Sequence, residues 1–306
     1  MNHYLDQLIG EEEFLFKKLA LQDIDNVPVI RANKADIREQ ETCLFHGTVP
    51  DGDAYGEALK RTLSQGVAHR RAVPVVRFAD GEFAFYQNTL HCNGLYQQAE
   101  SLEAIGEALP AHIRALQALS RIGLLAPLIF PGNTRKKSRG LLSFLRRPAG
   151  DDSAVHFLDF LRRHGIALTA QNYLPFYVVY AFLTSADFAR LVDGKKLCLL
   201  NSEYDPEACR HWFARFQSHP EIIYRPIPAA YVATQWEKMR EPILAQVPPD
   251  IDLCLVGAGV GALLVCLDVA ERFSIPALDA GHVLNMMNGR EDKSNGARLY
   301  TLRTVK

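Results

Sequence analysis

The sequence has little that would place the chain in a membrane, outside the cell or on nucleic acid. Its 306 residues carry 34 Lys and Arg against 35 Asp and Glu, a net charge of −1, whereas nucleic-acid binding usually needs a strongly basic face. Apolar runs such as residues 174–183 are shorter than the roughly 20 residues that cross a bilayer. The start, MNHYLDQLIGEEEF, lacks the basic-then-apolar order of a secretory signal. We therefore expect a cytoplasmic protein that binds no nucleic acid.

Cysteine is also scarce. The six cysteines show no CxxC and no paired Cys/His spacing, which argues against a disulfide framework and against a zinc site. Cys198 and Cys254 lie inside apolar runs, where a free thiol behaves as a small hydrophobic side chain. With 48% hydrophobic and 23% charged residues, the composition is that of an ordinary globular protein.

Two regions are distinguished along the chain. Residues 1–54 are predicted to form an N-terminal helical extension, with an amphipathic helix over 1–22 and a polar stretch after it, which packs on the rest or mediates a dimer. Residues 55–306 are predicted to form an α/β domain, because apolar strands and amphipathic helices alternate there. Strands are expected at 73–78, 122–130, 166–170, 195–200, 221–227, 252–257 and 275–280, and helices at 54–66 (closed by Gly66), 102–116, 154–163, 174–192, 206–216, 231–244 and 261–273.

This alternation predicts a mostly parallel, Rossmann-like sheet with helices on both faces. The carboxyl ends of its strands then share one edge, where such folds bind ligands. Pro127 indicates that the second strand lies at an edge of the sheet or ends early.

The first candidate site is RFADGEF, residues 77–83, directly after the first strand. Asp80 and Glu82 are two residues apart, so in extended backbone both carboxylates point to the same side. Such a pair suits Mg²⁺ or Mn²⁺, which in turn neutralises a diphosphate, and Gly81 allows a sharp turn. The alternative is that Asp80 and Gly81 simply form a hairpin turn.

The second candidate site is VGAGVGALL, residues 256–264, between a strand and a helix. Gly257, Gly259 and Ala262 fit a loose dinucleotide-binding pattern, in which glycines let a phosphate approach backbone N–H groups. Asp279 lies 20 residues after Gly259, where that pattern expects an acidic ligand for a ribose. The alternative is close packing of a helix on a strand through small residues.

The third candidate site is LDAGH, residues 278–282. Asp279 and His282 can orient one another and supply a base or a ligand for a sugar hydroxyl or phosphate; the alternative is a structural histidine.

A fourth candidate is the segment 133–148, which has six basic and no acidic residues. Its part 135–147 suits a phosphate clamp or contact with an anionic membrane surface; the alternative is a solvated loop.

The order of RFADGEF, a late glycine-rich turn and LDAGH resembles the GT-D-type glycosyltransferase family, whose members typically carry Arg-Phe-Gly-Asp-Gly-Glu early and Asp-x-Gly-His late. The resemblance implies that Asp80 and Glu82 serve a metal and a nucleotide-sugar donor. Arg77 matches the motif arginine, and the late element is matched by Asp279, Gly281 and His282. This sequence departs from the family at Ala79, where glycine is usual, and at residues 169–175 (TAQNYLP), where a Thr-Arg-Pro-like element is expected.

The resulting hypothesis is a glycosyltransferase that depends on Mn²⁺ or Mg²⁺. It moves a sugar from a nucleoside-diphosphate sugar, with a UDP-sugar favoured, to a glycan, glycoprotein or lipid-linked acceptor. Its candidate catalytic residues are Asp80, Glu82, His282 and Asp279; its candidate donor-binding residues are Arg77, Gly81, Gly257, Gly259 and Gly261.

Two alternatives stay open. One is an enzyme that binds NAD or S-adenosylmethionine through residues 257–262 and Asp279. The other is a non-catalytic partner in glycan assembly that docks through its basic segment.

Overall fold

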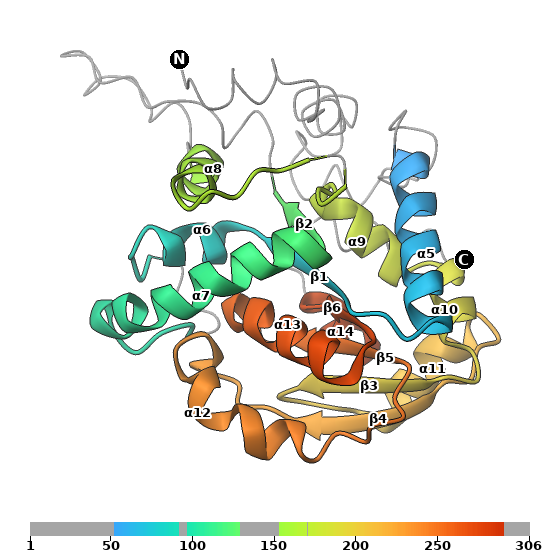
Figure 1. Ribbon diagram of the computed structural model, residues 1–306. Coiled ribbons are helices and arrows are strands. Elements are labelled where there is room, and N and C mark those ends of the chain that lie inside the picture. Colours follow the sequence, from blue (N-terminus) through green and yellow to red (C-terminus); the bar gives the residue numbers. More distant parts are fainter. Residues whose placement is uncertain (1–51, 92–96, 129–152, 170, 291–306) are drawn as a thin grey trace, which may run out of the picture.

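The computed structural model describes residues 52–91, 97–128, 153–169 and 171–290 of the chain (Figure 1). Six parallel strands form one sheet in the order β2-β1-β6-β5-β3-β4. The N-terminal helix predicted at 1–22 and the basic segment 133–148 lie outside the described residues. The strands are β1 Val73–Phe78, β2 Leu124–Pro127, β3 Lys196–Asn201, β4 Glu221–Pro226, β5 Leu253–Gly257 and β6 Pro276–Asp279.

Helices cover both faces of this sheet, which confirms the predicted fold class. One hydrophobic cluster joins the sheet to α6 Asp80–Tyr86, α7 Leu102–Ile122, α8 Ser153–Arg163, α12 Val232–Leu244 and α13 Ala262–Phe273. The other cluster joins the opposite face to α5 Gly52–Ala68, α9 Phe176–Leu183, α10 Ala186–Val192, α11 Pro206–Ala214 and α14 His282–Met287. Among the residues described, no helix has the length and apolarity needed to cross a bilayer.

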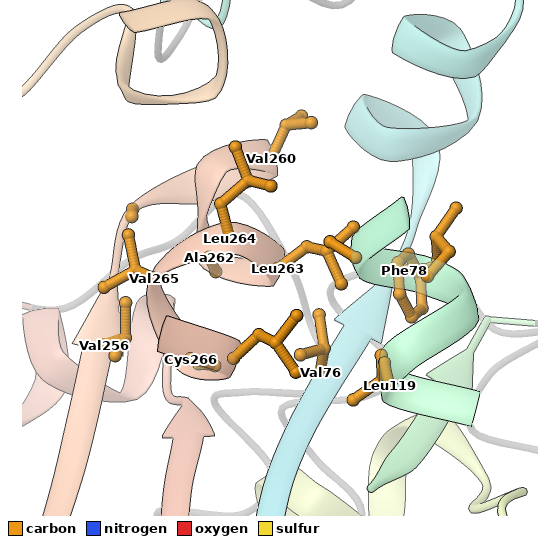
Figure 2. Close-up of a cluster of buried hydrophobic side chains, with 14 of the residues drawn as sticks. Val76, Phe78, Leu119, Val256, Val260, Ala262, Leu263, Leu264, Val265 and Cys266 are labelled. Carbon is orange, nitrogen blue, oxygen red and sulfur yellow. The ribbon is translucent and has the colours of Figure 1, made fainter. Parts of the chain in front are cut away.

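Helix α13 lies at the centre of the first cluster. In Figure 2 its Leu263 and Cys266 lie among Val76 and Phe78 of β1 and Leu119 of α7. Each of these side chains is at most 1% exposed, and full burial of an aliphatic or aromatic side chain contributes about 1.5–3 kcal/mol. The cysteines described, at 198, 209, 254 and 266, are free and buried, as the apolar runs around Cys198 and Cys254 predict.

The edge position predicted from Pro127 is confirmed, because β2 is an outer strand and ends at this residue. The strand predicted at 166–170 is wrong over the residues described there. The Asn172 side chain accepts the Thr169 N–H at 2.7 Å and donates to the Ala167 carbonyl at 3.0 Å. Local side-chain hydrogen bonds of this kind compete with a strand ladder.

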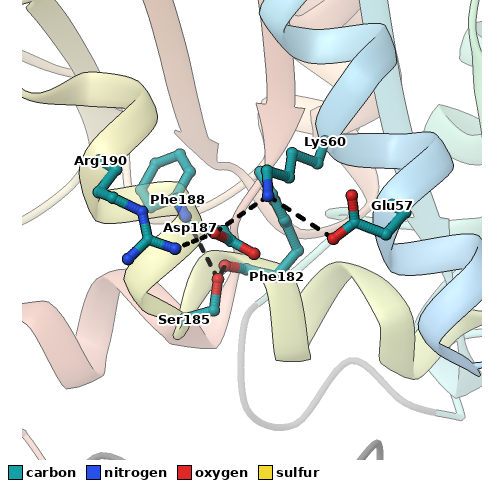
Figure 3. Close-up of polar contacts among 7 residues, drawn as sticks. All are labelled: Glu57, Lys60, Phe182, Ser185, Asp187, Phe188 and Arg190. Carbon is teal, nitrogen blue, oxygen red and sulfur yellow. Dashed lines mark hydrogen bonds and ion pairs between the residues drawn. The ribbon is translucent and has the colours of Figure 1, made fainter.

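The single helix predicted over 174–192 is instead two helices. Ser185 has extended backbone and caps α10, accepting the Phe188 N–H at 3.2 Å and donating to the Phe182 carbonyl at 2.7 Å. Figure 3 shows this break, with Lys60 of α5 reaching Asp187 of α10 at 3.2 Å. The apolar periodicity continues through the break, so the capping serine was the sequence signal of it.

Helix α5 continues past Gly66 to Ala68, so the predicted C-cap at Gly66 is also wrong. A Cβ at Gly66 would stand 2.7 Å from Pro276. This glycine therefore allows α5 to approach β6 closely.

Candidate functional site at the carboxyl edge of the sheet

Three of the four candidate sites meet at one edge of the sheet. Strands β1, β6 and β5 are neighbours, and RFADGEF, LDAGH and the glycine-rich turn stand at their respective carboxyl ends. The Ala280 N–H donates to the Val256 carbonyl at 2.9 Å, which joins LDAGH directly to the end of β5. The prediction that these motifs share one edge is confirmed for these three.

A buried ion pair connects the first motif to the third. Arg77 and Asp279 are 6% and 5% exposed. Arg77 donates from Nη2 to Oδ1 of Asp279 at 3.0 Å, from Nε to the Asp279 carbonyl at 3.0 Å and from its backbone N–H to Oδ2 at 3.3 Å. The guanidinium also lies over the rings of Tyr180, at 4.3 Å, and Phe176, at 5.4 Å, in positions that give cation–π attraction.

The positive charge of Arg77 is stabilised by the groups that surround it. Burial opposes the charged form, but Asp279 and Tyr180 together outweigh this effect and raise the pKa of Arg77 above its ordinary value. Arg77 therefore stays charged, and its contacts tie the ends of β1 and β6 to α9. Arg77 makes these contacts inside the protein, so any effect on a bound donor would act through its field rather than by direct touch.

Gly281 of LDAGH makes room for this pair. Its backbone has φ 42° and ψ −120°, a region in which residues with a Cβ are strained. A Cβ built there would collide with Nη2 of Arg77. His282 follows as the first residue of α14 and is partly buried, so the glycine also sets the position of this histidine at the edge of the sheet.

The extended backbone expected for Asp80 and Glu82 is wrong, because α6 begins at Asp80. Residues two apart on a helix point about 200° away from each other. Asp80 is exposed in the first turn, whereas Glu82 is partly buried and its Oε2 accepts the Ala79 N–H at 2.7 Å. Asp80 and Gly81 thus open a helix rather than a hairpin, and Glu82 caps it.

The surroundings of Glu82 make it an unusual carboxyl. Burial raises the pKa of Glu82 to about 7, against the opposing effect of the Ala79 N–H. The negative charge of Asp279 adds to the rise and the positive charge of Arg77 opposes it. Glu82 is therefore electrostatically linked to the buried ion pair, and near neutral pH it is balanced between its charged and neutral forms.

The glycine-rich turn is filled by protein atoms. Gly259 has φ 52°, and the Val260 N–H donates to Oε1 of Gln98 at 2.8 Å. A Cβ at Gly257 would stand 2.5 Å from Oδ1 of Asn201 and one at Gly261 would stand 2.6 Å from Val232. This arrangement favours the close-packing interpretation of these glycines over a phosphate-binding one.

Gln98 and Asn201 are site residues that the sequence patterns did not predict. Asn201 ends β3 and is 7% exposed, so its place after an apolar strand was a usable signal. Gln98 precedes a helix and carried no such signal. It lines a small pocket, whose enclosed part has room for about one water molecule, beside Gly81, Phe85, Thr89 and Ile105.

The carboxylates at this edge are the candidate ligands of a divalent cation. Within the described ranges, no group of three or more His, Cys, Asp or Glu side chains is placed to hold a metal. Mg²⁺ in nucleotide sites, however, takes only one or two carboxylates together with phosphate oxygens and water. Exposed Asp80 therefore fits a cation shared with a diphosphate, whereas Glu82 points away from it and caps α6. The described residues hold no closed protein cage.

Comparison with known proteins gives one match. No curated protein and no solved structure matches the chain. Residues 153–287 match the model of the GT-D fold-like domain family. The matched residues run from α8 to α14, so they include LDAGH and leave out RFADGEF. The parallel sheet agrees with this match, so residues 153–287 are similar to a GT-D fold-like domain.

Proposed function

We propose that the protein is a glycosyltransferase that moves a sugar from a nucleoside-diphosphate sugar to a glycan, glycoprotein or lipid-linked acceptor. The observation that carries the proposal is the meeting of Asp80 and Glu82 with LDAGH at the carboxyl edge of a GT-D-type sheet. Ligands of open α/β sheets bind at this edge. The site thus combines acidic groups for a metal-bound diphosphate with a histidine for the acceptor.

Asp80 would hold Mn²⁺ or Mg²⁺ together with phosphate oxygens of the donor, and Glu82 would support it by fixing the first turn of α6 and adding negative charge nearby. When bound, such a cation stabilises the negative charge that develops on the leaving diphosphate. Asp80 is exposed in the first turn of α6, within reach of a ligand. Glu82 is oriented by the Ala79 N–H through one carboxylate oxygen, which reduces the conformational freedom lost on binding.

Arg77 and Asp279 position these groups. Their three hydrogen bonds connect the end of β1, which leads into Asp80, to the end of β6, which leads into His282. His282 is proposed as the base that takes the proton of the acceptor hydroxyl in an inverting reaction. Asp80 is the alternative base, and Asp279 is less suited because its carboxylate already accepts hydrogen bonds from Arg77.

The proposal is tested by a transfer assay with UDP- and GDP-sugars in the presence of Mn²⁺. We expect Asp80→Ala and Glu82→Gln to lose transfer while their unfolding temperatures stay close to that of the wild type. Glu107→Ala is the matched control, because Glu107 is also exposed on a helix of the same domain but belongs to none of the edge motifs. Near-wild-type turnover in both site variants would refute the proposal.

A thermal-shift titration separates the alternatives. Stabilisation by UDP or GDP only in the presence of Mn²⁺ supports the transferase and identifies the base of the donor. Stabilisation by NAD or S-adenosylmethionine without metal, lost in Asp279→Ala, would instead support a nucleotide-cofactor enzyme.

A further inference from the structure

The side chain of Gln98 lies flat against the glycine-rich turn. Its Oε1 accepts the Val260 N–H at 2.8 Å. A Cβ at Gly259 would stand 2.5 Å from Oε1 and 2.6 Å from Nε2 of Gln98, so only a glycine there allows the amide to approach. Gly259 therefore allows both the positive φ of the turn and the close approach of the Gln98 amide.

This contact determines which way the amide faces. A backbone N–H can only donate, so the oxygen of the Gln98 amide faces Val260 and the nitrogen faces away from it. Within the part of the chain that the structure describes, Nε2 has no hydrogen-bond partner. Gln98 is partly exposed, and its two N–H donors are thus available to a ligand.

The neighbours of Gln98 hold it in place. The Gln97 carbonyl accepts the Tyr231 N–H at 2.9 Å, and the Glu100 carboxylate accepts the Thr234 hydroxyl at 2.6 Å. Ala99 between them is 1% exposed. The segment 97–100 is therefore tied to the start of α12 on both sides of Gln98, which makes the amide a preorganised donor.

Gln98 also lies next to the acidic motif. It lines the same pocket as Gly81, which stands between Asp80 and Glu82. A Cβ at Gly81 would stand 3.9 Å from Val260, so the start of α6 and the glycine-rich turn are in contact. The pocket wall is mostly apolar, with Phe85 and Ile105 in it, and Gln98 supplies an amide.

We infer that Gln98 is a further substrate-binding residue, whose Nε2 donates a hydrogen bond to an oxygen of the glycosyl donor bound beside Gly81. This inference rests on the proposed function. The oxygen belongs to a phosphate or to a sugar hydroxyl, and both accept hydrogen bonds from an amide. Gln98 gives the site a direct neutral donor, whereas the guanidinium of Arg77 is engaged by Asp279 inside the protein.

The test uses Gln98→Glu and the matched control Gln97→Glu. Glutamate at 98 keeps the size and an oxygen for the Val260 N–H, but it loses both N–H donors and adds a negative charge. Gln97 is the exposed neighbour, and its known contact uses the backbone carbonyl, so the same charge change there leaves that contact intact. Gln98→Met removes the donors without adding charge and separates their loss from repulsion.

Binding of UDP, GDP and UDP-glucose is measured by calorimetry with Mn²⁺ on the full chain. We expect Kd to rise about tenfold or more in Gln98→Glu, less in Gln98→Met and under about twofold in Gln97→Glu. A rise already seen with UDP or GDP assigns the phosphate as partner of Nε2, and a rise confined to UDP-glucose assigns the sugar.

Two results would overturn the inference. If both Gln98 variants fold and bind the probes with the Kd of the wild type, the role of Gln98 is refuted and the proposed function is not affected. If wild-type protein binds none of the three probes, both the proposed function and the role of Gln98 are refuted. Unfolding temperatures of all variants are recorded beside the binding data, and if Gln98→Glu fails to fold, Gln98→Met decides.

Discussion

Replacing Asp279 by alanine leaves the guanidinium of Arg77 buried without its counter-charge. In the wild type this guanidinium donates to Oδ1 and to the carbonyl of Asp279, and Arg77 is only 6% exposed. Its surroundings include the rings of Phe176 and Tyr180, which attract a cation but cannot replace a carboxylate. The variant must therefore rearrange or bring water to a charge that now lies in the core.

The expected loss of stability follows from this burial. Removing one partner of a buried ion pair lowers the free energy of unfolding by about 3–5 kcal/mol, because the remaining charge is uncompensated. For a domain of this size, each kcal/mol corresponds to a fall of about 2–4 °C in Tm. We therefore expect Asp279→Ala to lower Tm by about 10 °C, and urea unfolding to show the loss as a lower midpoint with an unchanged slope.

A double variant separates the cost of a lone charge from the value of the pair. Arg77→Met together with Asp279→Leu removes both charges, and replacing a buried pair by apolar side chains is often neutral or stabilising. Methionine at position 77 can pack against Phe176 and Tyr180 through its thioether. We expect the double variant to recover at least half of the stability that Asp279→Ala loses. A loss under about 1 kcal/mol in the single variant, or no recovery in the double one, would refute this account.

Two further predictions concern Gly281 and His112. Gly281→Ala should lower the free energy of unfolding by about 2 kcal/mol or more, since its φ is 42° and a Cβ would collide with Arg77. Gly106→Ala is the control, because a Cβ there meets no atom within 4 Å and alanine favours the helix. This control variant should gain about 0.5–1 kcal/mol in the same urea assay. Burial lowers the pKa of His112 from its ordinary 6.5 to about 4, so the unfolded chain takes up a proton at a pH where the folded protein does not, and stability falls by about 3 kcal/mol between pH 6.5 and 4. His112→Gln should lose this part of the pH dependence, and equal slopes in variant and wild type would contradict the assignment.

The order of strands and helices was largely predictable from the sequence. Strands of a parallel sheet are covered on both faces, so they appear as short apolar runs such as residues 253–257 and 196–201. Pro127 marked an edge strand because proline cannot donate to a sheet ladder. The prediction failed at Asn172 and Ser185, where one polar side chain redirects the backbone through hydrogen bonds that a hydrophobic pattern does not contain.

The candidate site was predictable in its location and less so in its contacts. Motifs at strand ends converge because parallel strands share one carboxyl edge, which the alternation alone implies. The conformation of Asp80 and Glu82 was not predictable in this way, since two carboxylates with one residue between them fit either a strand or the start of a helix. The helix is favoured because the Ala79 N–H donates to Oε2 of Glu82, which caps it.

The sequence by itself thus determined a parallel α/β sheet and the edge at which its polar motifs gather. Apolar runs indicate strands buried on two faces, and the alternation of strands and helices indicates that these strands are parallel. Only the tertiary structure decided that Arg77 pairs with Asp279, 202 positions away, and that Gln98 reaches Val260, 162 positions away. The first contact requires β1 and β6 to be neighbours, and the second requires the segment before α7 to cross the turn after β5. The packing of the whole chain determines such neighbours. It brings together residues far apart in the sequence, and the local sequence around one does not predict its contact with the other.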